Sequence, residues 1–282
     1  MRSVLVLVAG VMAVANAASA ETQLERGAYL VDVVGACDNC HTPRPNRITD
    51  FSKRLSGGTL VFNEVWFTAR ASNITPDPAT GIGKWSDDAL KAAIVKGVRP
   101  NGTPVAPVMP FSFYAVMSAG DQDAMVAYLR TIPAITNEVP PPTYKTEFYK
   151  LEYPDAARIT EEEMKNPVRR GAYLAGLMHC MACHARRAEE LPPDFKGAWG
   201  AGGRKITTPA GEVTAQNISS HPVKGLAAWS DAEIKRALTE AISKDGRKLK
   251  PPMSDFSFYW KKLRPDDLDA LVAWIRSIPP IE

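Results

Sequence analysis

The chain repeats itself at an offset of about half its length of 282 residues. The pentapeptide Arg-Gly-Ala-Tyr-Leu at 26–30 recurs at 170–174, and Phe-Ser-Phe-Tyr at 111–114 recurs at 256–259. Only two copies exist, and each is more than a hundred residues long. Because a solenoid is built from many short units, this pattern predicts a duplicated domain instead.

The repeat divides the chain into four expected segments. These are a leader at 1–20, a first domain at 21–138, a linker at 139–166 and a second domain at 167–282. The linker opens with three consecutive prolines and continues with charged residues. Such a composition is typical of a connection between domains rather than of a packed core.

The leader has the pattern of an export signal. Arg2 precedes an apolar run that begins at Val4, and the small-residue triplet Ala-Ser-Ala ends at Ala20. This run is shorter than the roughly 20 apolar residues that a membrane-spanning helix needs. The length favours a cleaved signal peptide over the alternative of an uncleaved membrane anchor, and predicts an exported, soluble mature protein.

Helix signals dominate within each copy. Ser86 and Ser230 are predicted helix N-caps, each followed by acidic residues in the first turn. Each copy closes with an amphipathic run, over 122–132 and 266–278, that stops before a proline. No convincing alternating strand pattern accompanies them. We therefore expect two all-α domains with long loops rich in glycine and proline.

The charge of the chain argues against a role in binding nucleic acid. The formal net charge is only +3, and the sequence contains no blocks rich in lysine and arginine. A protein that holds a phosphate backbone needs a concentrated basic surface. Partners other than nucleic acids are expected.

All four cysteines belong to two copies of the pattern C-x-x-C-H. The copies consist of Cys37, Cys40 and His41, and of Cys180, Cys183 and His184. This pattern is the attachment signature of c-type haem, since two thiols on one helical turn can bond to the two vinyl groups of one porphyrin and the histidine can bind its iron.

Other uses of a C-x-x-C pair are a disulfide, a thioredoxin-like redox pair and half of a zinc site. A redox pair is expected beside a βαβ pattern, which this sequence lacks. Both motifs follow the same Arg-Gly-Ala-Tyr-Leu segment in a chain with an export signal. The sequence therefore predicts two covalently attached haem c groups.

Two methionines are candidates for the second axial ligand of each iron. Met109 lies 68 residues after His41, and Met253 lies 69 residues after His184. Both stand among prolines, which disfavour helix and stiffen a loop. A single methionine would more simply be core filler, but recurrence in both copies favours ligation, because methionine with histidine is an established haem pair.

The remaining histidines, His179 and His221, have no counterparts in the first copy, where Ala36 and Asp77 lie nearby. We expect ordinary polar roles for both. A displaced iron ligand is the alternative.

With these residues in place, both halves resemble class I cytochrome c domains. Asn-Ile-Thr-Pro-Asp at 73–77, Gly-Ile-Gly-Lys-Trp at 81–85 and Met109-Pro110 carry the resemblance in the first half. The second half is looser, with Asn-Ile-Ser-Ser at 217–220 and Ser254 after the methionine. The arrangement is similar to the cytochrome c subunits of periplasmic alcohol and aldehyde dehydrogenases. It implies an all-α fold of two tandem class I cytochrome c domains joined by a Pro-rich linker.

The resemblance implies a periplasmic dihaem electron carrier. A periplasmic dehydrogenase is the expected donor, another cytochrome or a terminal oxidase the expected acceptor, and membrane association is expected only through these partners. If both irons have two protein ligands, neither has an open position for substrate, which favours electron transfer over catalysis.

The rival interpretation is an enzyme, either a dihaem peroxidase or a thiosulfate-oxidising dihaem cytochrome. A peroxidase needs one iron that can open for peroxide. The sulfur enzymes, by resemblance, use a distal cysteine, and all four cysteines of this chain are assigned to haem attachment. A binding module without redox function is a third interpretation, for which two attached haems would have no purpose.

Overall fold

The computed structural model describes residues 21–147, 153, 159–185, 193–208 and 211–282. The leader predicted at 1–20 lies outside the described residues, as does part of the predicted linker.

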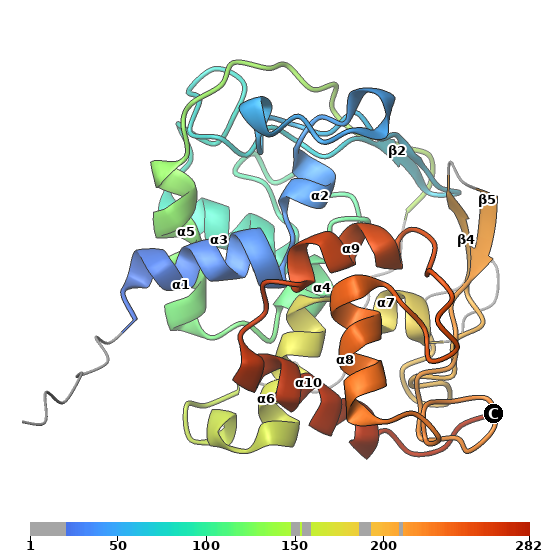
Figure 1. The fold of residues 1–282 in the computed structure, drawn as a ribbon. Coiled ribbons are helices and arrows are strands. Elements are labelled where there is room, and N and C mark those ends of the chain that lie inside the picture. The colour runs from blue at the N-terminus through green and yellow to red at the C-terminus, as the bar shows by residue number, and fades with distance from the viewer. Residues whose placement is uncertain (1–20, 148–152, 154–158, 186–192, 209–210) are drawn as a thin grey trace, which may run out of the picture.

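Helices form most of the regular structure, and they follow the same order in each half (Figure 1). The first half contains α1 (Gln23–Tyr29), the π-helical turn η1 (Leu30–Val34), α2 (Asp38–His41), α3 (Asp87–Lys96), α4 (Phe111–Tyr114) and α5 (Ala119–Thr131). The second half contains α6 (Pro167–Leu177), α7 (Met181–His184), α8 (Asp231–Glu240), α9 (Met253–Trp260) and α10 (Pro265–Ser277). Short 3-10 turns occur at η2 (Pro45–Arg47), η3 (Phe51–Lys53) and η4 (Glu163–Lys165).

The expectation of purely helical domains is incomplete, because the long loops also form short antiparallel strands. One sheet contains β1 (Phe62–Asn63), β2 (Phe67–Ala69) and β3 (Thr143–Tyr144). A hairpin joins β4 (Lys205–Thr208) and β5 (Gly211–Thr214). Strands of two to four residues are too short to leave a clear period-two pattern in the sequence.

The first residues of the predicted linker are part of the folded structure. β3 lies within 139–166 and pairs with β2, so that Phe67 stands opposite Tyr144. The Tyr144 hydroxyl also donates a hydrogen bond of 2.6 Å to the Pro104 carbonyl. This segment is therefore attached to the loops of the first half at its start.

The first and last helices of each half cross at a glycine. A Cβ atom on Gly27 of α1 would lie 2.0 Å from the Ala124 carbonyl oxygen of α5. A Cβ atom on Gly171 of α6 would lie 2.0 Å from the Ala270 carbonyl oxygen of α10. Since backbone cannot yield as a flexible side chain can, only glycine permits this close approach. The repeated Arg-Gly-Ala-Tyr-Leu segment thus specifies a helix crossing.

The π-helical turn accounts for a one-residue difference between the two copies. The repeated pentapeptides are 144 residues apart, but the two C-x-x-C-H motifs are 143 residues apart. The extra residue of the first half lies in η1, where the Gly35 amide donates to the Leu30 carbonyl at 2.8 Å. A wider i→i+5 turn absorbs one added residue without ending the helix. The two motifs consequently begin at equivalent places after the helix that precedes each of them.

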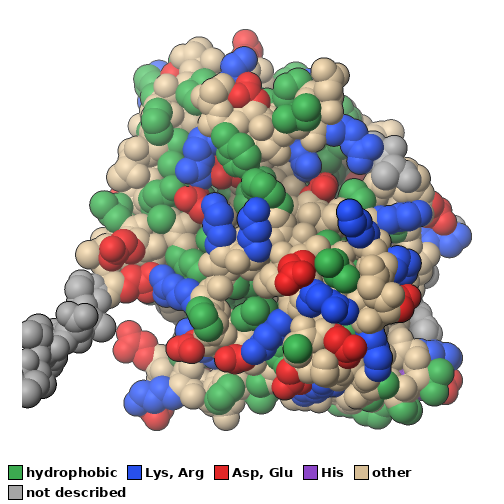
Figure 2. All heavy atoms as spheres, viewed as in Figure 1, with side chains coloured by type: hydrophobic (Ala, Val, Ile, Leu, Met, Phe, Trp, Pro, Cys, Tyr) green, Lys and Arg blue, Asp and Glu red, His purple; other side chains and the backbone are tan. Residues whose placement is uncertain are grey.

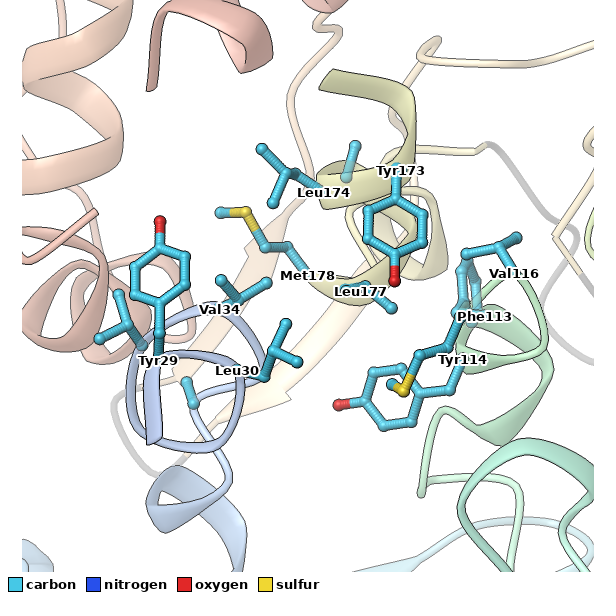
Figure 3. Packing of buried hydrophobic residues seen from close by; sticks show 14 of the residues in the cluster. Tyr29, Leu30, Val34, Phe113, Tyr114, Val116, Tyr173, Leu174, Leu177 and Met178 are labelled. Carbon is cyan, nitrogen blue, oxygen red and sulfur yellow. The ribbon is translucent and has the colours of Figure 1, made fainter. Parts of the chain in front are cut away.

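A single cluster of buried hydrophobic side chains spans both halves. Figure 3 shows Leu30 and Val34 of the first half in the same region as Leu174 and Met178 of the second. Each of these four side chains is almost completely buried. The two halves therefore share their core. The domain boundaries expected at 138 and 167 stay predictions.

The visible surface carries both signs of charge. On the face shown in Figure 2, lysine and arginine side chains are interspersed with aspartate and glutamate. Within the described ranges, every helix is too short or too polar to cross a bilayer.

Candidate haem-attachment sites

Each C-x-x-C-H motif follows a sharp turn at the end of a long helix. The residue before the first cysteine, Ala36 in one half and His179 in the other, has a left-handed backbone, with φ of +46° and +45°. Cys37 and Cys180 are the N-cap residues of the short helices α2 and α7. No disulfide joins any of the four cysteines. The local fold thus places the two predicted motifs in the same conformation.

Both motif histidines are oriented by a backbone carbonyl. His41 Nδ1 lies 2.7 Å from the Ser72 carbonyl oxygen, and His184 Nδ1 lies 2.7 Å from the Gln216 carbonyl oxygen. A carbonyl can only accept, so each Nδ1 carries the proton and each Nε2 keeps a free lone pair. This arrangement is typical of metal-binding histidines. Burial also lowers the pKa of both imidazoles, which favours the neutral form that binds iron.

The environment of the thiols argues against a redox pair. Burial raises the pKa of Cys40 to about 11 and that of Cys180 to about 12. Burial, with a contribution from Asp38, also raises the pKa of Cys37. Reactive cysteines have the opposite property, since a lowered pKa supplies the thiolate. Among the described residues, no cluster of three or more Cys, His, Asp or Glu side chains suits a metal ion, so the zinc alternative gains no support.

The candidate methionines occupy matching positions in the two halves. Met109 lies in the loop just before α4, and Met253 is the first residue of α9. Both are partly buried and pack against the shared core, as do Cys37 and Cys180. Their role as iron ligands stays a prediction.

Two arginines that no sequence pattern pointed to donate hydrogen bonds to the residue just before the second cysteine of each motif. Arg44 Nη1 donates to Asn39 Oδ1 at 3.0 Å, and Arg204 Nη1 donates to the Ala182 carbonyl at 2.7 Å. The Nε atoms of both arginines are buried, and no described residue accepts a hydrogen bond from them. Buried donors of this kind suit a bound group that brings its own acceptors. The two arginines are not equivalent in the repeat alignment, so the sequence offered no signal for them.

The other two histidines have different surroundings. His221 Nδ1 accepts hydrogen bonds from the amides of Val223 and Lys224 at 3.1 and 3.0 Å, which makes it a local turn residue, as expected. The His179 ring packs edge-on against Phe256, with ring centroids 5.3 Å apart. Burial lowers the pKa of His179 to about 4, so its ring is neutral at neutral pH.

Paired and partly buried cysteines, each pair followed by a neutral and oriented imidazole, define a c-type haem-binding protein. Comparison with known proteins agrees with this class. A family model of cytochrome c matches residues 168–279. The chain is 30% identical over 257 residues to a diheme cytochrome c-type protein of Cereibacter sphaeroides, with 88% of this chain and 83% of that protein covered. The chain belongs to the cytochrome c family, and membership implies covalently attached haem c.

Two further relatives are longer than this chain. The gluconate 2-dehydrogenase cytochrome c subunit of Pantoea cypripedii is 27% identical over 295 residues, which cover 99% of this chain and 65% of that subunit. The fructose dehydrogenase cytochrome subunit of Gluconobacter japonicus is 27% identical over 274 residues, which cover 91% of this chain and 52% of that subunit. The chain thus spans less than two thirds of the length of either relative.

Proposed function

We propose that this chain is a dihaem electron carrier that accepts electrons from a dehydrogenase and passes them to another cytochrome or a terminal oxidase. One observation carries the proposal. His41 and His184 stand in two equivalent C-x-x-C-H motifs, and each has its Nδ1 held by a backbone carbonyl at 2.7 Å. Both imidazoles are thereby oriented to bind an iron through Nε2, once in each half of the chain.

Each half would hold one haem within one class I cytochrome c domain, over 21–138 and 167–282. The first haem would be bound by Cys37, Cys40, His41 and Met109, and the second by Cys180, Cys183, His184 and Met253. Bound haem supplies a one-electron iron couple. The cysteines would attach it and the histidines and methionines would bind its iron, and these ligands with their surroundings would set the potential.

The donor and the compartment are inferred from the relatives and from the leader. Relatives named as cytochrome subunits of gluconate and fructose dehydrogenases support a dehydrogenase donor. The predicted signal peptide at 1–20 supports action in the periplasm. Contact with a membrane would come only through the partners.

A haem count tests the proposal most directly. Pyridine haemochrome analysis of the purified, matured protein should return two covalent haems per chain. The variant Cys37→Ser with Cys40→Ser should retain one, and the matched variant Cys180→Ser with Cys183→Ser should retain the other.

A wild-type count below two would contradict the dihaem proposal. Carbon monoxide binding distinguishes an electron carrier from an enzyme. A reduced haem iron with two protein ligands should bind carbon monoxide poorly. Ready binding to one reduced haem of the wild type would favour a dihaem enzyme instead.

A further inference from the structure

Helix α9 of the second half lies against the segment that leads into the first attachment motif. It contacts η1, which ends three residues before Cys37. In Figure 1, α9 is seen between α2 and α7, the two short helices of the motifs. Its last residue, Trp260, is almost completely buried, with 3% of its surface exposed. One aromatic helix thus reaches the surroundings of both sites.

A continuous set of contacts runs through α9 from His179, beside the second motif, to Val34, three residues before the first motif. His179, bonded directly to Cys180, packs its ring edge-on against Phe256 at a centroid separation of 5.3 Å. The rings of Phe256 and Trp260 are stacked, 4.9 Å apart and inclined by 10°. Trp260 Nε1 then donates a hydrogen bond of 3.4 Å to the Val34 carbonyl. These separations are those of aromatic rings in direct contact.

We infer that His179, Phe256 and Trp260 form an aromatic bridge that carries electrons between the two haem sites. The inference rests on the proposed function. Electron tunnelling declines less steeply through bonded and closely packed atoms than across gaps, so a contiguous path is the faster one. In each transfer one electron would leave the reduced iron of one site and would reduce the oxidised iron of the other. No proton and no further reactant takes part.

The bridge is a property of the second half and not of the repeated fold. The first half holds Ala36, Phe111 and Ala115 at the positions of His179, Phe256 and Trp260. Two of the three bridge residues are therefore alanine in the other copy, which folds around the same helices. The fold itself does not require an imidazole or an indole at these positions. Their presence in one copy only is consistent with a role between the copies.

The experiment measures electron exchange within the molecule. In half-reduced holo-protein, exchange between the two irons averages the paramagnetically shifted haem methyl signals in NMR spectra. Phe256→Leu and Trp260→Leu should each slow this exchange severalfold without changing the haem count. His179→Ala, which installs the residue of the first half, should act in the same direction. Phe111→Leu is the matched control, because it makes the same change at the equivalent site outside the bridge.

Redox titration and thermal unfolding of each variant distinguish a path from simple packing. If Phe256 and Trp260 serve only in packing, their replacement by leucine should lower the melting temperature or shift the haem potentials. Phe111→Leu should then show comparable effects. A bridge role slows exchange while the potentials stay in place, and Trp260→Phe should restore most of the rate.

Equal exchange rates in Phe256→Leu, Trp260→Leu and the Phe111→Leu control would overturn the bridge while leaving the dihaem carrier intact. Absence of exchange in a wild-type protein with two haems would also overturn it. A wild type with fewer than two haems would refute both proposals together.

Discussion

The Tyr29 hydroxyl donates a hydrogen bond of 2.7 Å to Asp267, across 238 residues of sequence. The reciprocal bond also exists, because the Tyr173 hydroxyl donates to Asp121 at 2.6 Å. Tyr29 and Tyr173 are the same residue of the repeated pentapeptide. In each half, the tyrosine hydroxyl therefore donates a hydrogen bond to an aspartate in the last helix of the other half.

The acceptor carboxylates are held by arginines of their own halves. Arg26 forms an ion pair with Asp121 at 2.7 Å, and Arg170 pairs with Asp267 at 2.6 Å. Asp267 is only 1% exposed. A buried carboxylate is expensive to leave unpaired, so each arginine and each crossing tyrosine stabilises the contact between the halves.

Removal of one crossing hydroxyl should weaken the whole fold. Tyr29→Phe is expected to lower the free energy of unfolding by about 1–3 kcal/mol, because a buried charged acceptor loses a donor. Denaturant titration of the holo-protein measures the loss. Tyr128→Phe is the control, since its hydroxyl donates to the partly exposed Asp32 within one half. A loss in Tyr29→Phe no greater than in this control would contradict the importance of the crossing bond.

The two crossing glycines should tolerate no side chain. Gly27→Ala and Gly171→Ala place a methyl group against backbone carbonyls, at separations of 2.0 Å before any movement. We expect each to destabilise the protein by about 1–3 kcal/mol or more, as overpacking does. Gly120→Ala in α5 is the matched control, because no described residue outside its own stretch of helix lies within 4 Å of its Cβ position.

That control should be neutral or stabilising by about 0.4–1 kcal/mol, since alanine reduces the entropy of the unfolded chain. Thermal melts of the three variants under one set of conditions provide the comparison. Equal melting temperatures would mean that the helices separate easily at these crossings.

Methionine ligation predicts a specific spectroscopic loss. The oxidised wild type should show the weak long-wavelength band of methionine-ligated ferric haem, and Met109→Leu or Met253→Leu should each remove about half of it. Each substitution should also lower the potential of its haem, within the roughly 0.8 V range that axial ligands control. Met117→Leu, in the buried core, should leave the band unchanged. If both Met109→Leu and Met253→Leu kept the full long-wavelength band, another residue would be the second iron ligand.

Acid should destabilise the protein through His179. Its pKa is lowered by burial to about 4 in the folded state, against about 6.5 in an unfolded chain. Below pH 6.5 the unfolded chain binds a proton that the folded protein does not, so stability falls as the pH drops and levels off near pH 4. The contribution amounts to about 3 kcal/mol over that range.

His179→Asn should remove this part of the pH dependence, because asparagine is neutral and accepts left-handed backbone. Unfolding free energies at pH 7 and pH 4.5 for both proteins provide the measurement. Identical pH profiles would show that His179 is protonated without cost.

Local signals in the sequence predicted several helices well. Ser86 caps α3 by accepting from the Ala89 amide at 3.2 Å, and Ser230 forms a capping box with Glu233 at the start of α8. The two closing runs are helices α5 and α10, each beginning within a few residues of its predicted start. These features depend on neighbours three or four positions away, which a sequence pattern records directly.

The short strands and the motif arginines escaped prediction. β3 pairs with β2 across about 75 residues of chain, and its two residues carry no periodic pattern. Arg44 and Arg204 reach equivalent positions of the two motifs from places that do not match in the repeat. Their contacts depend on how the loops fold back, which no local spacing reveals.

The sequence by itself determined the duplication, the capped helices and the two C-x-x-C-H motifs, because covalent chemistry and helical spacing act over a few residues. Only the tertiary structure decided that Tyr29 bonds to Asp267, that Ser72 and Gln216 orient the histidines, and that Trp260 lies against Val34. The physical reason is that these partners are distant in the chain. They meet only when both halves bury their apolar faces in one shared core.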